Sequence, residues 1–275
     1  MVQALQITLF GVIRPRRHVH VGGLVTATPV TMVRRKISFP ANGLQLRANE
    51  LAVWTVDVAD FDTSITDSLI RTLSASEILR ANRFKKPDDK CRYIYARGVL
   101  RHLLSGYLSL DPVQLNFAYN DYGKPGFACG ESPTVCFNIS HSKDIILLAF
   151  AATRPVGVDV EEINHKSRVE ALANRFFSTE ESLALALVPP GGKHESFFET
   201  WTQKEAFLKA QGTGISNGLN HSTMVSLGNN SFAVLTSSSG ETYTVYSLAA
   251  PQGYKACAAV QGLEFELAQH TLELR

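Results

Sequence analysis

The sequence lacks several features that define well-known protein classes. Its 275 residues contain no run of 18 or more apolar residues, so neither a membrane span nor a membrane partner is predicted. Only four cysteines occur, with no C-x-x-C pair and no close cysteine and histidine cluster: Cys91, Cys129, Cys136 and Cys257. A disulfide framework or zinc site is therefore not expected, and free thiols in a reducing compartment, the cytoplasm, are predicted instead.

Acidic residues are absent from residues 1–49, which carry seven basic residues. The remaining 226 residues then hold 20 of the 27 basic residues and all 25 acidic ones, a net charge of −5. A mildly acidic body disfavours nucleic acid as a partner. The basic extension is predicted to be poorly ordered, and an upstream, non-native or dispensable start is the favoured interpretation. An organelle transit peptide is the alternative, although the amphipathic helix of such a leader is not visible.

Residues 50–153 alternate between helical and strand patterns. Residues 51–58 alternate apolar and polar side chains, which is typical of a half-buried strand. Ser74 and Glu77 form a capping-box pattern before a short helix, and apolar residues from 93 to 107 recur at helical spacing. Residues 135–139 and 145–151 are predicted strands that flank Ser140-His141-Ser142.

Residues 154–265 repeat this mixture after the Arg154-Pro155 dipeptide, which we take as the joint between two halves. A strand is predicted at 156–161, a helix at 167–176 followed by a second helix, and a long helix at 196–210. Alternating segments near 222–227, 231–236, 242–248 and 255–260 indicate antiparallel strands. No internal repeat is visible from residue identity.

Two stretches carry the chemistry. Asp159 and Glu161 share one face of a strand, about 7 Å apart. Glu205 and Lys209 are four residues apart and share one face of a helix. If the stretches meet in space, their carboxylates can hold a hard cation such as Mg²⁺, and the lysine can contact a phosphate. The simpler alternative is a solvated sheet face and a surface ion pair, and the spacing alone does not exclude it.

Five motifs occur in order along the chain. They are Gly-Lys-Pro (123–125), Phe-Asn-Ile-Ser-His-Ser (137–142), Gly-Val-Asp-Val-Glu (157–161), Arg-Phe-Phe-Ser-x-x-Glu (175–181) and Trp-Thr-x-Lys-Glu-Ala-Phe-Leu-Lys-Ala-x-Gly-x-Gly (201–214). As a set, they resemble the motifs of Sfp-type 4′-phosphopantetheinyl transferases, of the holo-[acyl-carrier-protein] synthase superfamily. The resemblance covers roughly residues 50–260 and does not include 1–49.

The resemblance implies a role for each matching residue. It implies Mg²⁺ ligation by Asp159, Glu161 and Glu205, and a place near the transferred phosphate for Lys209. It further implies coenzyme A contacts by Arg80, Arg92, Lys124, Ser140 and His141. Glu77 stands where some relatives carry a lysine, which questions one part of the phosphate pocket. Whether Glu181 reaches the metal or only orders its loop stays open.

The resemblance also implies an α+β pseudo-dimer, with the active site in the cleft between the halves. The expected reaction moves 4′-phosphopantetheine from coenzyme A to a serine of an apo acyl, polyketide or peptidyl carrier protein. Glu205 would accept the serine proton, directly or through a water, and adenosine 3′,5′-bisphosphate would leave. The 50–153 half is expected to bind the coenzyme A nucleotide and the 154–265 half to bind Mg²⁺ and catalyse transfer, in a monomeric protein.

Two other functions remain open. A Mg²⁺-dependent nuclease or phosphodiesterase also groups carboxylates with a lysine, but it is expected to show a basic substrate face. A scaffold that binds carrier proteins without catalysis could keep the same fold, although it has no need for acids at 159, 161 and 205. The sequence does not indicate which carrier protein or pathway is served, or whether Mg²⁺ is preferred over Mn²⁺.

Overall fold

The fold is described from a computed structural model. It covers residues 30–36, 43–60, 63–128, 134–213, 224–228, 231–235 and 240–273. Most of the basic extension lies outside these ranges, as do Cys129 and Gly214.

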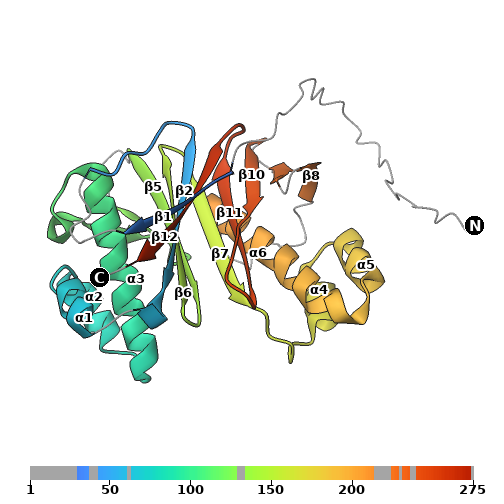
Figure 1. The fold of residues 1–275 in the computed structure, drawn as a ribbon. Coiled ribbons are helices and arrows are strands. Elements are labelled where there is room, and N and C mark those ends of the chain that lie inside the picture. Colours follow the sequence, from blue (N-terminus) through green and yellow to red (C-terminus); the bar gives the residue numbers. More distant parts are fainter. Residues whose placement is uncertain are drawn as a thin grey trace, which may run out of the picture.

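Two five-stranded sheets form the centre of the molecule (Figure 1). The first sheet has the order β1-β12-β2-β6-β5, and the second has the order β7-β11-β10-β9-β8. The strands of the first sheet are β1 (Val30–Lys36), β2 (Glu50–Asp57), β5 (Val135–Ser142), β6 (Ile145–Ala152) and β12 (Glu266–Glu273). Those of the second are β7 (Val156–Glu162), β8 (Met224–Gly228), β9 (Ser231–Leu235), β10 (Thr242–Ser247) and β11 (Tyr254–Gln261).

Helices cover the outer face of each sheet, so that the layers run helix, sheet, sheet, helix (Figure 1). The first set is α1 (Thr63–Ile70), α2 (Ala75–Ala81) and α3 (Pro87–Leu108), and the second is α4 (Val169–Phe176), α5 (Thr179–Leu187) and α6 (Lys193–Gln211). Short 3₁₀ turns lie at Val58–Asp60, Pro112–Gln114 and Pro190–Gly192, and β3 (Phe117–Tyr119) pairs with β4 (Pro125–Phe127) as a small hairpin.

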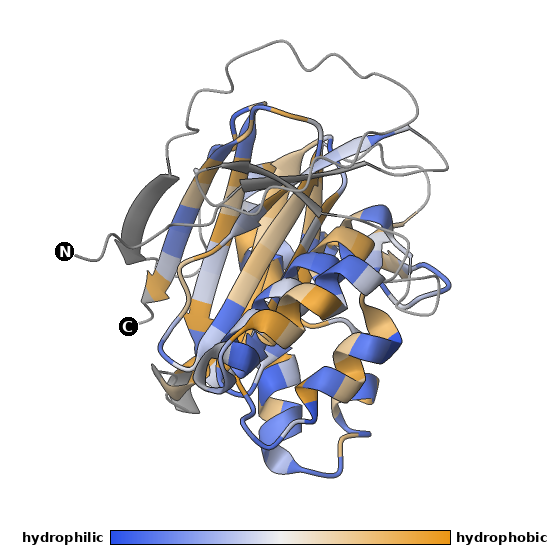
Figure 2. Ribbon diagram, turned by 90° about the vertical axis from the view of Figure 1, so that its right-hand side faces the viewer, coloured by the Kyte–Doolittle hydropathy of each residue, from blue (hydrophilic) through white to orange (hydrophobic). Residues whose placement is uncertain are grey.

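Buried apolar side chains hold these layers together. Leu51 and Val53 of β2 belong to one cluster with Val158 of β7, so the two sheets pack face to face. The opposite face of β2 presents Trp54, which packs with residues of α3. In Figure 2 the central strands are largely hydrophobic, while the helices in front carry hydrophilic and hydrophobic residues. Leu51 and Val53 face one side of β2 and Trp54 faces the other, because side chains alternate along a strand, and here both faces are buried.

The two halves have the same order of elements. In each half a strand is followed by three helices, a hairpin pair and two more antiparallel strands. Accordingly β2-β6-β5 and β7-β11-β10 have matching positions and matching antiparallel pairing. The chain therefore has the predicted α+β architecture of two similar halves, although residue identity did not reveal the duplication.

Strands β1 and β12 depart from the expected boundaries. β12 follows residue 265, where we expected the second half to end, but it pairs in parallel with β2 of the first sheet. Residues 30–36 fall in the basic extension and pair in parallel with β12. Short-range sequence patterns predicted neither of these two strands. In the described part of the chain no helix is long and apolar enough to cross a membrane.

Candidate active site

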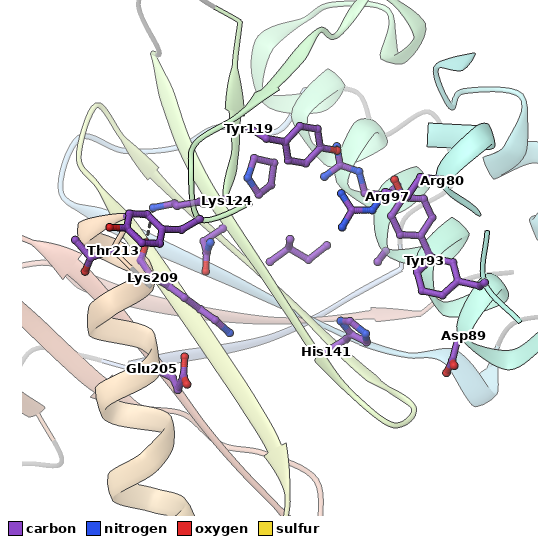
Figure 3. Close-up of a pocket in the computed structure, with 18 residues that line it drawn as sticks. Arg80, Asp89, Tyr93, Arg97, Tyr119, Lys124, His141, Glu205, Lys209 and Thr213 are labelled. Carbon is purple, nitrogen blue, oxygen red and sulfur yellow. Dashed lines mark hydrogen bonds between the residues drawn. The ribbon is translucent and has the colours of Figure 1, made fainter. Parts of the chain in front are cut away.

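A cavity of about 660 Å³ opens between the halves (Figure 3). From the first half it receives basic and aromatic side chains of α2, α3 and the β3–β4 hairpin, and from the second half it receives two residues of α6. Those that the argument below uses are Arg80, Tyr93, Arg97, Tyr119, Lys124, Asn138, His141, Glu205 and Lys209. Positive charge and flat rings thus face a carboxylate and an ammonium across one space.

Beside this cavity, Lys209 joins the two halves. Its Nζ lies 2.6 Å from Asp159 Oδ1 and 3.0 Å from Ser140 Oγ. Ser140 in turn donates its hydroxyl proton to the same Asp159 oxygen, at 2.9 Å. Asp159 is only 3% exposed, and its other oxygen, Oδ2, is buried with no hydrogen-bond partner among the described residues. A buried carboxylate oxygen without a hydrogen-bond partner is unfavourable in free energy, so Asp159 Oδ2 is a candidate ligand for a bound ion or molecule.

Glu161 and Glu205 add further acidic charge. Burial and, to a smaller extent, the charge of the neighbouring Asp159 raise the pKa of Glu161 to about 7, against the opposing effects of Ser142 and Lys209. Burial likewise raises the pKa of Glu205 to about 7, against the opposing effect of Lys209. When all three carboxyl groups are ionised, their negative charge exceeds the positive charge of the one ammonium in a desolvated site. This is the arrangement in which a bound cation stabilises the ionised acids most.

The acidic residues of the site have the chemistry of metal ligands. Carboxylate oxygens are the preferred ligands of Mg²⁺, and Asp159 Oδ2 is an unpartnered oxygen of that type. Within the described ranges, however, no three acidic, histidine or cysteine groups are grouped closely enough to form a ready-made metal centre. The ammonium of Lys209 is the cation closest to Asp159 in the described contacts. The donor chemistry therefore fits a divalent cation, although three donors are not gathered around one point in the described residues.

A glycine allows α6 to lie directly against β7. A Cβ built on Gly157 would stand 2.0 Å from the carbonyl oxygen of Ala206 and 2.4 Å from the amide nitrogen of Ala210. Because both atoms are main chain, no side-chain rotation can relieve the contact. Gly157 thus sets the short separation that lets Glu205 and Lys209 of α6 approach Asp159 of β7.

The residues predicted to contact coenzyme A differ in their surroundings. Arg80 lines the cavity, where its guanidinium lies over the rings of Tyr93 and Tyr119, 5.8 and 5.7 Å from the centroids. Arg92 is not among the residues that line the cavity, and it pairs with Asp89 at 2.7 Å. Their roles in binding a phosphate stay predictions.

His141 and Lys124 also line the cavity. Desolvation and the cations Lys209 and Arg92 lower the pKa of His141, which favours the neutral imidazole. Lys124 Nζ donates to the main-chain oxygens of Val156 and Lys209, at 3.0 and 2.5 Å, and burial lowers its pKa to about 8. A lysine from the first half thus caps the C-terminal end of α6. Contact with a phosphate would require Lys124 to exchange these partners.

Glu77 and Glu181 have equivalent structural roles in the two halves. Each is the third residue of a helix whose N-cap serine it contacts in a capping box, and each forms an ion pair with the long helix that follows. Glu77 is 3% exposed and binds Arg97 and Arg101, both at 2.7 Å. Glu181 binds Lys204 at 2.7 Å. Glu77 is therefore held in a buried ion-pair network, and Glu181 orders the α5–α6 region, with Lys204 as its structural partner.

Several residues near the site were not singled out from the sequence. Tyr93, Tyr119 and Arg97 line the cavity, but aromatic residues in a helix or a short strand are more often core residues. Asn138 and Ser142 lie within the Phe-Asn-Ile-Ser-His-Ser motif, and both contact β7. Their alternation with Ser140 along a strand is a signal that could have identified them.

Comparison with known proteins shows which class this architecture defines. Residues 155–260 match the 4′-phosphopantetheinyl transferase superfamily, and residues 59–153 match the family described as 4′-phosphopantetheinyl transferase, N-terminal. The chain is 41% identical over 175 residues to the 4′-phosphopantetheinyl transferase HetI of a Nostoc species, covering 63% of this chain and 73% of HetI. It belongs to the 4′-phosphopantetheinyl transferase superfamily.

Other relatives carry the same description. The chain is 32% identical to Sfp of Bacillus subtilis, covering 53% of this chain and 68% of Sfp, and 34% identical to AcpT of Escherichia coli, covering 52% of this chain and 70% of AcpT. Among solved structures, a holo-(acyl-carrier-protein) synthase from Bacillus anthracis matches with a TM-score of 0.32 and 17% identity, over 39% of this chain and 94% of that chain. A structural similarity of this size supports no conclusion by itself.

Proposed function

We propose that this protein transfers the 4′-phosphopantetheine group of coenzyme A to a serine hydroxyl of an apo carrier protein. The observation that carries the proposal is the position of Lys209, which lines the cavity between the halves and contacts Asp159 of β7. A diphosphate substrate needs positive charge beside a group that can accept a proton. Glu205 lines the same cavity, so a positive charge and a group that can accept a proton lie at one site.

The nucleotide end of coenzyme A is assigned to the first half. Arg80 offers a planar guanidinium for a phosphate, and Tyr93 and Tyr119 offer rings that can pack against a base. His141 and Lys124, with Ser140 and Arg92 nearby, complete the set that the sequence motifs imply. A cavity of about 660 Å³ lies within the ordinary range for sites that take small molecules and cofactors.

The metal site is assigned to Asp159, Glu161 and Glu205, with Mg²⁺ as the proposed ion. Bound there, Mg²⁺ would offset the negative charge of the carboxylates and of the substrate diphosphate. Asp159 is aligned for this role because Ser140 and Lys209 hold one of its oxygens and leave the other unpartnered.

The protein residues then supply the proton transfer and the charge for the reaction. Glu205 accepts the proton of the carrier serine, because its carboxylate lines the cavity beside Lys209. The serine oxygen forms a bond to the phosphorus that bears pantetheine, and the bond from that phosphorus to the bridging oxygen breaks. Adenosine 3′,5′-bisphosphate leaves with the electron pair, while Lys209 offsets the negative charge that develops.

The experiment is mass spectrometry of a panel of apo carrier proteins incubated with coenzyme A, Mg²⁺ and the protein. Transfer adds the mass of phosphopantetheine to the acceptor, and Asp159→Ala or Glu205→Ala is expected to lower turnover by two orders of magnitude or more. Near wild-type turnover of either variant would refute the assigned roles. Incubation with DNA or RNA tests the nuclease alternative, and failure to bind coenzyme A with metal in calorimetry would favour the scaffold alternative. A monomeric state and a cytoplasmic location belong to this proposal.

A further inference from the structure

Strands β5 and β7 are edge strands of different sheets and are joined by side chains. Asn138 Oδ1 accepts a hydrogen bond from the Val158 amide at 2.9 Å. Ser140 contacts Asp159 and Ser142 contacts Glu161, at 2.9 and 3.2 Å. The partner numbers rise together, so the two strands run in parallel. Side chains of every second β5 residue thus take the place of the main-chain ladder that would otherwise link two strands.

The hydroxyl of Ser142 has a single proton, and its surroundings direct that proton to Glu161. The Ser142 oxygen accepts the amide hydrogen of Glu162 at 3.0 Å. It lies 3.2 Å from Glu161 Oε2, the only acceptor that its described contacts offer. A serine hydroxyl can donate one hydrogen bond while it accepts another. The main chain of β7 therefore fixes the hydroxyl, and the hydroxyl fixes one oxygen of the Glu161 carboxylate.

We propose that Ser142 is a positioning residue that holds the Glu161 carboxylate ready for a divalent cation, an inference that rests on the proposed function of this site. Ser140 has the same role for Asp159: its hydroxyl donates a hydrogen bond to Oδ1, and Oδ2 has no partner among the described residues. The two serines are two residues apart on β5, as the two acids are on β7. One oxygen of each acid is held by the first half of the chain, and the other is available to a ligand.

Asn138 supports this register from deeper in the structure. It is 3% exposed, and its bond to the Val158 amide ties the main chains of β5 and β7 together. A slip of one residue between the two strands would place neighbouring residues of β7, instead of the acids, opposite the two serines, because side chains alternate along a strand. Asn138 thus sets which residues oppose each other, and Ser142 sets the orientation of one carboxylate.

Metal affinity distinguishes positioning from general stability. Groups that orient a metal ligand commonly change affinity by about 10- to 100-fold when they are removed. We expect Ser142→Ala to raise the Kd of the full-length protein for Mn²⁺ about tenfold, measured by electron paramagnetic resonance with and without coenzyme A. Ser142→Thr keeps the hydroxyl and is expected to stay within threefold of wild type. Turnover of Ser142→Ala at saturating Mg²⁺ is expected to recover most of the wild-type value.

Ser105→Ala is the matched control. Ser105 is a buried serine of α3 whose hydroxyl donates to the Leu110 main-chain oxygen, away from the cavity. Its loss is expected to lower the melting temperature without changing the Kd for Mn²⁺. Equal Mn²⁺ affinity of wild type and Ser142→Ala would overturn the inference, as would equal losses in Ser142→Ala and Ser142→Thr.

The two proposals fail separately. Wild-type protein that modifies no carrier protein, but whose Mn²⁺ affinity still depends on Ser142, contradicts the proposed reaction and keeps the positioning role. Active wild-type protein with an unchanged Ser142→Ala affinity contradicts the positioning role alone. Wild-type protein that binds no Mn²⁺ in either condition contradicts the positioning role as well.

Discussion

Replacement of Gly157 by alanine tests the closest approach between a strand and a helix in the candidate site. The new Cβ would lie 2.0 Å from the Ala206 carbonyl oxygen, whereas ordinary contact begins at 3.4 Å. The two main chains must therefore separate by about 1.4 Å. Because Lys209 reaches Asp159 from the same helix, their 2.6 Å contact must lengthen or be lost.

Two magnitudes follow from this displacement. Overpacking against main-chain atoms costs about 3 kcal/mol of unfolding free energy, the upper part of the usual range. For a chain of this size, that cost corresponds to a melting temperature lower by about 6–12 °C. A displacement of about 1 Å at a reacting centre can reduce turnover about 100-fold. The kcat is therefore expected to fall far more than the fraction of folded protein.

The assay combines differential scanning calorimetry with turnover measured at a temperature where the variant is fully folded. Gly126→Ala is the control, since nothing lies within 4 Å of its new Cβ and the glycine does not require a positive φ. It should leave both measurements near those of the wild type. A Gly157→Ala protein with wild-type kcat and melting temperature would show that the contact between β7 and α6 does not position the site.

Three further predictions concern other residues. Burial lowers the pKa of His102 to about 4, below its unfolded value near 6.5, so unfolding stability is expected to fall by up to about 3 kcal/mol as the pH falls through this window. In His102→Gln, urea titrations at acid pH should show a weaker dependence of the unfolding free energy on pH. An unchanged dependence would refute the assignment of this effect to His102. Lys204→Met leaves the Glu181 carboxylate without its buried partner and should cost about 3–5 kcal/mol in urea unfolding, whereas adding Glu181→Gln should restore part of it. Arg80→Ala should raise the KM for coenzyme A about tenfold with little change in kcat, and an unchanged KM would argue against a phosphate contact there.

Local patterns predicted much of the fold. The strand at 156–161, the capping box at Ser74 and the long helix at 196–210 agree with β7, α2 and α6 to within a few residues. These elements have strong local signals, namely alternation, cap chemistry and helical spacing. Strand β12 has no such signal, because its place between β1 and β2 depends on residues more than 200 positions earlier.

The candidate site was predicted only in part for the same reason. The motifs indicated Asp159, Glu205 and Lys209, and the structure brings Lys209 to Asp159 from two separate elements. The contacts of Lys124 with the end of α6 could not be inferred, since a lysine in a Gly-Lys-Pro turn is usually exposed. Side-chain partners between the halves depend on how the two sheets pack, and no single segment contains that information.

The placement of β12 has a consequence for synthesis and for protein engineering. This strand is made after both halves of the chain, yet it fills the position between β1 and β2 in the first sheet. A ribosome-bound chain that stops at residue 265 thus has an incomplete N-terminal sheet with β2 exposed as an edge. Separate expression of 50–153 and 154–273 should accordingly give fragments that need each other, and a split-protein reporter cut at Arg154 would depend on strand exchange to reassemble.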